Sequence, residues 1–232
     1  MKIAICTPHH SLVTSHYASC MVRMVLKTSE CIFDFNGQPT KAELNLMMRS
    51  SSLLPLARSL LVEDAVEWGA NYMLWVDSDH WFPDNALLRL LSWNIPVVGA
   101  NYPRRERPTY PTAHGVDEEL IWTTEEQAKS DAIEAVGTLG LGFCLVDMSV
   151  IHAIRKLNPD GTPRRMFAIG MTADWSGYIG EDAYFFQKVR DAGFAVHLDH
   201  GLSWQIGHAA EALLFNSDAA ADKADYLRGL ER

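Results

Sequence analysis

The sequence predicts an α/β fold in which a mainly parallel sheet lies between layers of helices. Residues 2–6 form a short apolar segment typical of a strand, and residues 15–27 have the character of a helix. Residues 72–76 have the length and the aromatic and β-branched content of a buried strand. Strands and helices that alternate in this way favour parallel pairing, with the helices packed on both faces of the sheet.

Helix and strand signals continue along the chain. Pro55 suits the first turn of a helix and Gly69 suits its end. The apolar face of that helix is expected to contain Ala57, Leu61, Ala65 and Trp68. The later elements expected are a helix over 84–93, a strand over 95–99, a loop over 102–111, a strand over 143–147, a helix from its cap Ser149 to Leu157, a helix from Gly180 to Gly193 and a strand over 194–198.

The composition indicates an ordinary globular protein. The chain has 232 residues, of which 48% are hydrophobic and 21% are charged, and these values argue against a disordered class. A formal net charge of -9 argues against broad electrostatic binding to polyanions. A local basic cluster of Arg104, Arg105 and Arg107 is still suited to meeting phosphate.

The cysteines and the hydropathy predict a cytoplasmic protein. Cys6, Cys20, Cys31 and Cys144 show no CxxC pairing, and no signal peptide precedes the first strand, so reduced thiols are expected. The sequence lacks an apolar run near the roughly 20 residues that cross a bilayer. We therefore expect no insertion into a membrane.

Two carboxylates separated by one residue follow the strand over 72–76. Asp77 and Asp79 are placed at the carboxyl end of that strand, which is the edge where α/β sheets bind ligands. Their hard oxygens suit Mg²⁺ or Mn²⁺, with a diphosphate filling other coordination positions. The alternative is a solvated turn that includes a helix cap.

The glycine-rich segment over 137–142 is a second candidate. It differs from a dinucleotide-binding loop because it precedes the strand over 143–147, whereas a phosphate loop follows a strand and opens a helix. Two interpretations stay open: a tight loop that exposes backbone beside a ligand, and a glycine-rich hairpin.

The last candidates lie in the final third of the chain. Glu181 and Asp182 open a helix, where acidic residues are ordinarily surface groups that complement the helix dipole. They follow an aromatic loop containing Trp175, which is suited to stacking on a sugar or a base. His208 is placed where it would complete a metal site, although a lone histidine is more often a surface or core residue.

The order of these motifs resembles that of nucleotide-sugar glycosyltransferases of the GT-A fold, especially compact bacterial and phage-type members. The similarity covers most of the chain. It rests on the first strand, Leu56-Ala57-Arg58-Ser59, Asp77-Ser78-Asp79, the glycine-rich turn before Phe143, Gly180-Glu181-Asp182 and Gly207-His208. It implies a single Rossmann-like domain over 1–232, with nucleotide and metal bound by 1–115, and with acceptor binding and catalysis in 116–232.

The resemblance also implies roles for individual residues. Asp79 and His208 would be ligands of Mn²⁺ or Mg²⁺, and Asp77 would lie near the metal or the ribose. The nucleotide would be bound by Thr7, Pro8, Arg58, Asp77 and Ser78, with Arg58 at the diphosphate and with Thr7 and Pro8 at the base. The donor or acceptor sugar would be contacted by Gly140, Gly142, Trp175 and Glu181. Asp182 would be the catalytic base, beside Glu181.

The implied activity is the metal-dependent transfer of a sugar, of the hexosyl class, from a nucleotide diphosphate-sugar to an acceptor hydroxyl. A UDP-sugar is the first donor expected, and the acceptor is a glycan, a protein or a modified nucleobase. Attack by a hydroxyl deprotonated by Asp182 would invert the anomeric centre, while a retaining reaction stays open. Two alternatives remain: a metal-dependent phosphohydrolase using Asp77, Asp79 and His208, and a noncatalytic nucleotide-sugar-binding protein.

Overall fold

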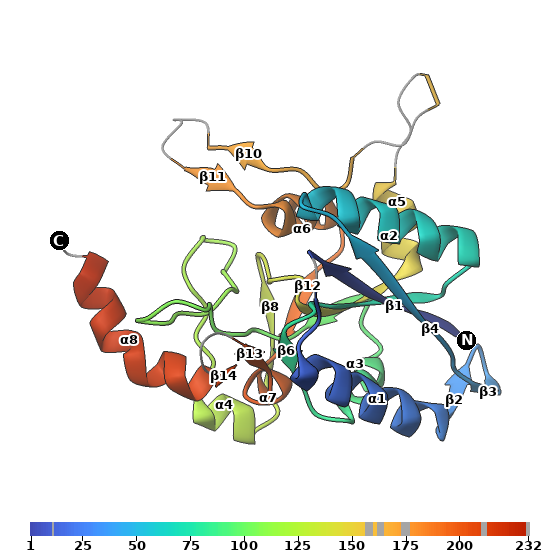
Figure 1. Ribbon diagram of the computed structural model, residues 1–232, viewed down its shortest axis with the longest axis horizontal. Helices are drawn as coiled ribbons and strands as arrows, with labels where there is room; N and C mark the ends of the chain where they lie inside the picture. The colour runs from blue at the N-terminus through green and yellow to red at the C-terminus, as the bar shows by residue number, and fades with distance from the viewer. Residues whose placement is uncertain (11, 156–159, 162–164, 173–176, 210–212, 231–232) are drawn as a thin grey trace.

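A seven-stranded sheet forms the centre of the computed structural model, which describes residues 1–10, 12–155, 160–161, 165–172, 177–209 and 213–230 (Figure 1). The strand order is β4-β1-β5-β9-β7-β12-β8. In chain order, these strands are β1 (Lys2–His9), β4 (Glu43–Ser50), β5 (Tyr72–Val76), β7 (Val97–Gly99), β8 (Ile133–Val136), β9 (Phe143–Asp147) and β12 (Val196–Asp199).

Most of these strands run in one direction. Strand β1 is parallel to β4 and β5, and β12 is parallel to β7. Strand β9 is antiparallel to both β5 and β7, and β8 is antiparallel to β12. Five of the seven strands therefore share a direction, and β9 and β8 oppose it. The predicted α/β class with a mainly parallel sheet is confirmed.

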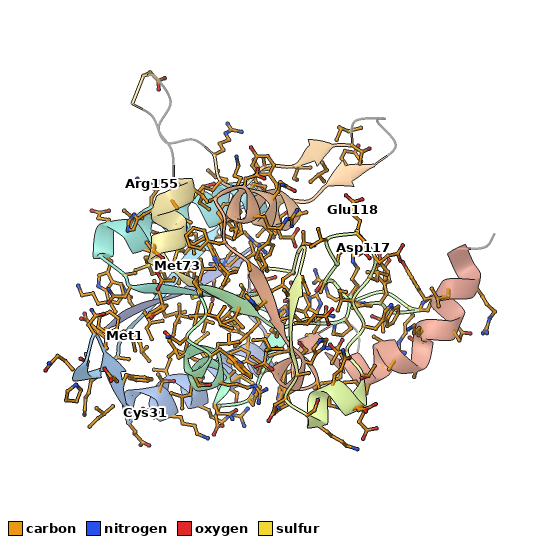
Figure 2. All side chains as sticks on the ribbon, turned by 180° about the vertical axis from the view of Figure 1, so that it is seen from behind. Met1, Cys31, Met73, Asp117, Glu118 and Arg155 are labelled. Atoms are coloured by element: carbon orange, nitrogen blue, oxygen red, sulfur yellow. The ribbon has the colours of Figure 1, made fainter. Side chains whose placement is uncertain are left out.

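Helices cover both faces of this sheet. Helices α2 (Leu54–Trp68), α5 (Met148–Ile154) and α6 (Glu181–Asp191) lie on one face, and α1 (Ser15–Ser29) and α3 (Ala86–Ser92) lie on the other (Figure 1). Along β5, Met73 and Trp75 join the core under α2, while Leu74 and Val76 join the core under α1. Figure 2 shows side chains filling the space around Met73. Because both faces are buried, the strand is apolar throughout.

Helix α2 begins and ends as the sequence predicts. Pro55 lies in its first turn, and Gly69 caps its end with φ of 72°. The Gly69 amide donates to the carbonyl groups of Ala65 and Val66. Glycine adopts this left-handed conformation at little cost, so the chain reverses directly into β5.

The helix after β9 differs from the prediction in its cap. The N-cap is Asp147, whose side chain accepts a hydrogen bond from the Ser149 amide, so Ser149 lies inside the helix. The helix ends at Ile154, and Leu157 lies outside the described residues. Asp147 takes this role because it is the last residue of β9 and still has extended backbone angles (φ -67°, ψ 139°).

Several elements were not anticipated. Strands β2 (Ile32–Phe35) and β3 (Gln38–Lys41) form a hairpin across Asn36 and Gly37, which both have positive φ. Edge strand β4 and the terminal helix α8 (Asn216–Leu230) also have no counterpart in the sequence prediction. The other elements are β6 (His80–Trp81), α4 (Glu125–Lys129), β10 (Gly170–Met171), β11 (Tyr178–Ile179), α7 (His200–Ser203), β13 (Gly207–Ala209) and β14 (Leu213–Leu214).

Across the described parts of the chain, we find no helix with the length and apolar character required to cross a membrane. All four cysteines are free thiols; Cys6, Cys20 and Cys144 are buried and Cys31 is partly exposed.

A buried carboxylate ties β12 to α3, and its removal should destabilise the fold. Asp199 is fully buried and accepts hydrogen bonds from Arg89 Nε at 2.6 Å, Trp93 Nε1 at 2.8 Å and the Leu202 amide at 2.9 Å. We expect Asp199→Asn to lower the free energy of unfolding by about 3 kcal/mol, because it leaves a cation without its buried partner. Urea denaturation measures this, with Glu125→Gln in an exposed ion pair as the control. Equal midpoints for the two variants would contradict it.

Candidate functional site

The turn after β5 lies where the ends of several strands meet. β1, β5 and β7 present their carboxyl ends at this edge, and antiparallel β9 presents its amino end. The Asp77 amide donates to the Gly142 carbonyl at 2.9 Å, and the Ala209 amide donates to the Asp79 carbonyl at 2.9 Å. These two bonds fix both ends of the Asp77-Ser78-Asp79 turn. Its two carboxylates are directed to different partners.

The first partner group contains two histidines. Asp79, His80 and His208 each offer one ligand atom, and these atoms all lie within 4.8 Å of one another. Asp79 Oδ1 is 3.4 Å from His80 Nδ1, and Asp79 Oδ2 is 3.5 Å from His208 Nε2. The two imidazole rings are stacked with their centroids 4.6 Å apart. Pairing of β13 with β6 places His208 directly opposite His80 and thereby builds the group.

Hydrogen bonding leaves imidazole nitrogens of this group available. His208 Nδ1 donates to the Pro103 carbonyl at 2.9 Å, and its Nε2 faces Asp79 at 3.5 Å. His80 is fully buried, and neither of its ring nitrogens has a hydrogen-bond partner among the residues described. Burial lowers the pKa of His80, which favours the neutral ligand form.

Asp79 is held in the charged form. Burial alone would raise its pKa, but the adjacent imidazoles of His208 and His80 place the pKa well below its usual range. A metal site requires a deprotonated carboxylate and neutral imidazoles. One carboxylate and two imidazoles with available nitrogens therefore form a donor set that fits a divalent transition-metal ion.

The second partner of the turn is a buried guanidinium. The Arg58 side chain is only 2% exposed, and its Nη2 lies 3.4 Å from Asp77 Oδ1 and 3.8 Å from Glu181 Oε1. Burial opposes the charge, yet Asp77, Glu181 and Asp182 raise the pKa of Arg58 above its ordinary value. Within the described chain, its Nε and Nη1 have no hydrogen-bond partner. A buried cation with unused donors suits an anionic ligand.

Helix α6 brings its first two acidic residues to this cation. Burial, followed by the charge of Asp182, raises the pKa of Glu181, although Arg58 acts in the opposite direction. Asp182 Oδ1 accepts a hydrogen bond from the Ala183 amide at 2.9 Å, so its carboxylate is turned toward the start of its own helix. The site thus combines one cation with three carboxylates.

The glycine-rich segment reaches the same place. Strands β8 and β9, which it connects, are not neighbours in the sheet, so the hairpin interpretation is wrong. A Cβ atom on Gly142 would lie 2.6 Å from both His80 Cε1 and the Tyr102 hydroxyl, and Gly140 packs against the same tyrosine. The Gly142 amide donates to the Tyr102 hydroxyl at 2.9 Å. Close packing therefore explains these glycines.

The residues expected at the nucleobase lie at the end of β1. Thr7 and Pro8 are buried, and the Thr7 hydroxyl is hydrogen-bonded to the Tyr17 hydroxyl at 2.6 Å. The Ser78 carbonyl accepts from the Thr14 amide at 3.0 Å. Trp175 lies outside the described residues. The Thr7 hydroxyl is therefore buried and already hydrogen-bonded within the protein.

Sequence reasoning missed His80 and Tyr102 as members of this site. His80 follows Asp79 directly, but its partner in the group, His208, lies 128 residues later in the chain. Tyr102 carried no signal, because its contact with Gly142 joins residues 40 positions apart.

Comparison with known proteins supports the fold. No protein-family model matches the chain, and no curated protein matches its sequence. The chain is similar to the crystal structure of A197 from STIV, with a TM-score of 0.55, 12% identity and coverage of 94% of this chain and 92% of that one. The two proteins therefore share an α/β fold, here with a seven-stranded, mainly parallel sheet between helices.

A second similarity is to the crystal structure of GalNAc-T7 with UDP, GalNAc and Mn²⁺. It has a TM-score of 0.46 and 10% identity, and it covers 90% of this chain. The chain spans 44% of the length of that glycosyltransferase.

The packing of Gly142 can be tested by adding a single methyl group. Gly142→Ala should lower the free energy of unfolding by about 1–3 kcal/mol, because His80 and Tyr102 must move to admit the new Cβ. Thermal and urea denaturation measure the change. The matched control is Gly229→Ala in α8, where a Cβ meets nothing within 4 Å and stability should not fall. Wild-type stability of Gly142→Ala would show that the glycine is not required by packing.

Proposed function

We propose that this protein is a metal-dependent glycosyltransferase that moves a sugar from a nucleotide diphosphate-sugar to an acceptor hydroxyl. The observation that carries the proposal is the arrangement of the Asp77-Ser78-Asp79 turn. Its first carboxylate faces the buried guanidinium of Arg58, and its second faces the imidazoles of His80 and His208. A nucleoside diphosphate needs positive charge on both of its phosphates. Arg58 and a bound metal ion would supply that charge from the two ends of one turn.

The proposed metal ligands are Asp79, His80 and His208, with Asp77 close enough in the chain to contact the ribose or a metal-bound water. Two imidazole nitrogens favour Mn²⁺ over Mg²⁺, because Mg²⁺ prefers an all-oxygen shell. When bound, the ion would neutralise negative charge on the departing diphosphate. The Pro103 carbonyl would orient His208 from the far side of its ring.

The protein residues would divide the remaining tasks. Arg58 would bind the diphosphate through the unused Nε and Nη1 groups, and Thr7, Pro8 and Ser78 would line the nucleotide. Gly140 and Gly142, with Trp175 and Glu181, would lie along the sugar. Asp182 would remove the proton from the acceptor hydroxyl as the oxygen attacks the anomeric carbon, a reaction that inverts this centre. A UDP-sugar of the hexosyl class is the first donor to test.

The proposal also covers the organisation of the chain. Residues 1–232 would act as one domain, with 1–115 holding nucleotide and metal and 116–232 holding the acceptor and the base. The central sheet contains strands from both parts, and His208 from the second part completes the metal group. Free thiols at all four cysteines are consistent with a cytoplasmic location. The acceptor would be a glycan, a protein or a modified nucleobase.

One assay separates this function from its two alternatives. The protein would be incubated with a panel of nucleotide-sugars, with and without Mn²⁺, and with phosphate esters. Donor hydrolysis or transfer that requires Mn²⁺ supports a glycosyltransferase. Cleavage of phosphate esters supports a phosphohydrolase, and binding without turnover supports a noncatalytic nucleotide-sugar-binding protein.

The metal assignment predicts a specific loss of affinity. Asp79→Asn, His208→Ala and His80→Gln should each weaken Mn²⁺ binding at least about tenfold, because each removes a ligand atom or its charge. Calorimetric titration measures the affinity, and circular dichroism confirms that the variants are folded. Asp84→Asn, an exposed carboxylate paired with Lys27, serves as the control. Wild-type Mn²⁺ affinity in folded Asp79→Asn and His208→Ala would contradict the assignment of these residues as metal ligands.

The base assignment predicts a loss of chemistry without a loss of binding. Asp182→Asn keeps the hydrogen-bond acceptor for the Ala183 amide but removes basicity, so sugar transfer should fall roughly 10²–10⁴-fold while donor affinity changes little. Single-turnover transfer and donor titration on the same sample measure both. Glu126→Gln, in the first turn of α4, controls for helix-dipole effects. Near-normal transfer with saturating acceptor would exclude Asp182 as the base.

A further inference from the structure

The loop that follows β7 carries an exposed cluster of arginines over the metal group. Its base is closed by a bridge between Pro103 and Pro111 and by the Arg104 amide, which donates to the Tyr110 carbonyl at 2.9 Å. Arg107 Nη1 is 2.7 Å from Asp222 Oδ2 of helix α8. Anchored at its base and through Arg107, the loop presents residues 104–108 to solvent.

Arg105 reaches from this loop into the metal group. Its Nη1 donates to Asp79 Oδ2 at 2.9 Å. The same oxygen lies 3.5 Å from His208 Nε2. The guanidinium therefore neutralises the one carboxylate of the group at the oxygen that faces His208 Nε2.

The two side chains of this pair differ in exposure. Arg105 is 61% exposed and Asp79 is 21% exposed. An arginine that exposed is solvated when its partner is lost, so moving it away costs little. Asp79, in contrast, is held in place by its own chain and by the two histidines.

We propose that Arg105 is a built-in competitor of the divalent cation for Asp79, and that metal binding releases it to meet the anionic ligand. A guanidinium hydrogen-bonded to a carboxylate oxygen and a divalent ion on that carboxylate repel each other at short distance. Metal binding therefore displaces Arg105 into the open space beside the group. A nucleoside diphosphate then gains a free cation, which couples diphosphate binding to metal binding. This inference rests on the metal site of the proposed function.

The competition has a direct measurement that requires no turnover. Mn²⁺ would be titrated calorimetrically into the wild-type protein, Arg105→Ala and Arg104→Ala, without nucleotide. Arg104→Ala is the matched control, because it removes the same charge one residue away. The Arg104 guanidinium lies over the Tyr110 ring, 4.8 Å from the ring centroid. We expect Arg105→Ala to bind Mn²⁺ about fivefold more tightly than Arg104→Ala, which corresponds to the ~1 kcal/mol of an exposed ion pair.

The coupling is measured by titrating UDP into the same three proteins, with and without saturating Mn²⁺. Wild type and Arg104→Ala should gain UDP affinity from Mn²⁺, and Arg105→Ala should gain several-fold less. An equal gain in Arg105→Ala would overturn the coupling, and equal Mn²⁺ affinity in Arg105→Ala and Arg104→Ala would overturn the competition. If Mn²⁺ binds the wild type and Asp79→Asn abolishes this binding, the proposed metal site stands even where the competition fails. Absence of Mn²⁺ binding in every variant overturns both.

Discussion

A guanidinium buried at the edge of the sheet where β1 and β5 end is the constraint on which the rest of this site depends. A buried cation is costly unless charged partners surround it, and Arg58 takes them from two elements: Asp77 after β5 and Glu181 at the start of α6. These contacts fix the entry of α6 relative to the end of β5. Two donor groups of Arg58, Nε and Nη1, have no hydrogen-bond partner among the described residues. A hydrogen-bond acceptor from outside the chain would supply one.

The one-residue spacing in Asp77-Ser78-Asp79 has a geometric explanation. The turn is anchored at one end to Gly142 and at the other to Ala209, and between these points its carboxylates diverge. Asp77 balances the permanent charge of Arg58, and Asp79 lies beside the imidazoles of His80 and His208. Two carboxylates that shared one environment would repel each other, and this separation reduces the repulsion.

The sequence predicts the helices and strands of this fold better than it predicts which of them lie side by side. The apolar run of β5, Pro55 and Gly69 are local signals, and the structure contains the strand and the helix they indicate. The hairpin at Asn36 and Gly37 also had a local signal, since Asn-Gly favours the left-handed angles of a two-residue turn. The role of His80 depends on a partner 128 residues later, so no local pattern could identify it. The reversed direction of β9, which carries Gly142 to the site, is likewise a property of the whole sheet.

The pairing of β13 with β6 also determines when the metal group can form. His208 can meet His80 only after residues 80–209 have all left the ribosome, because β13 (Gly207–Ala209) pairs with β6 (His80–Trp81). A nascent chain of the first half carries Asp79 and His80 without their third partner. A metal ion therefore cannot act as the nucleus of folding, as it does in a zinc finger, where ligands close in sequence assemble first. An ion bound by this group would be captured by a sheet that has already formed, and chelation would then remove the ion and leave the fold intact.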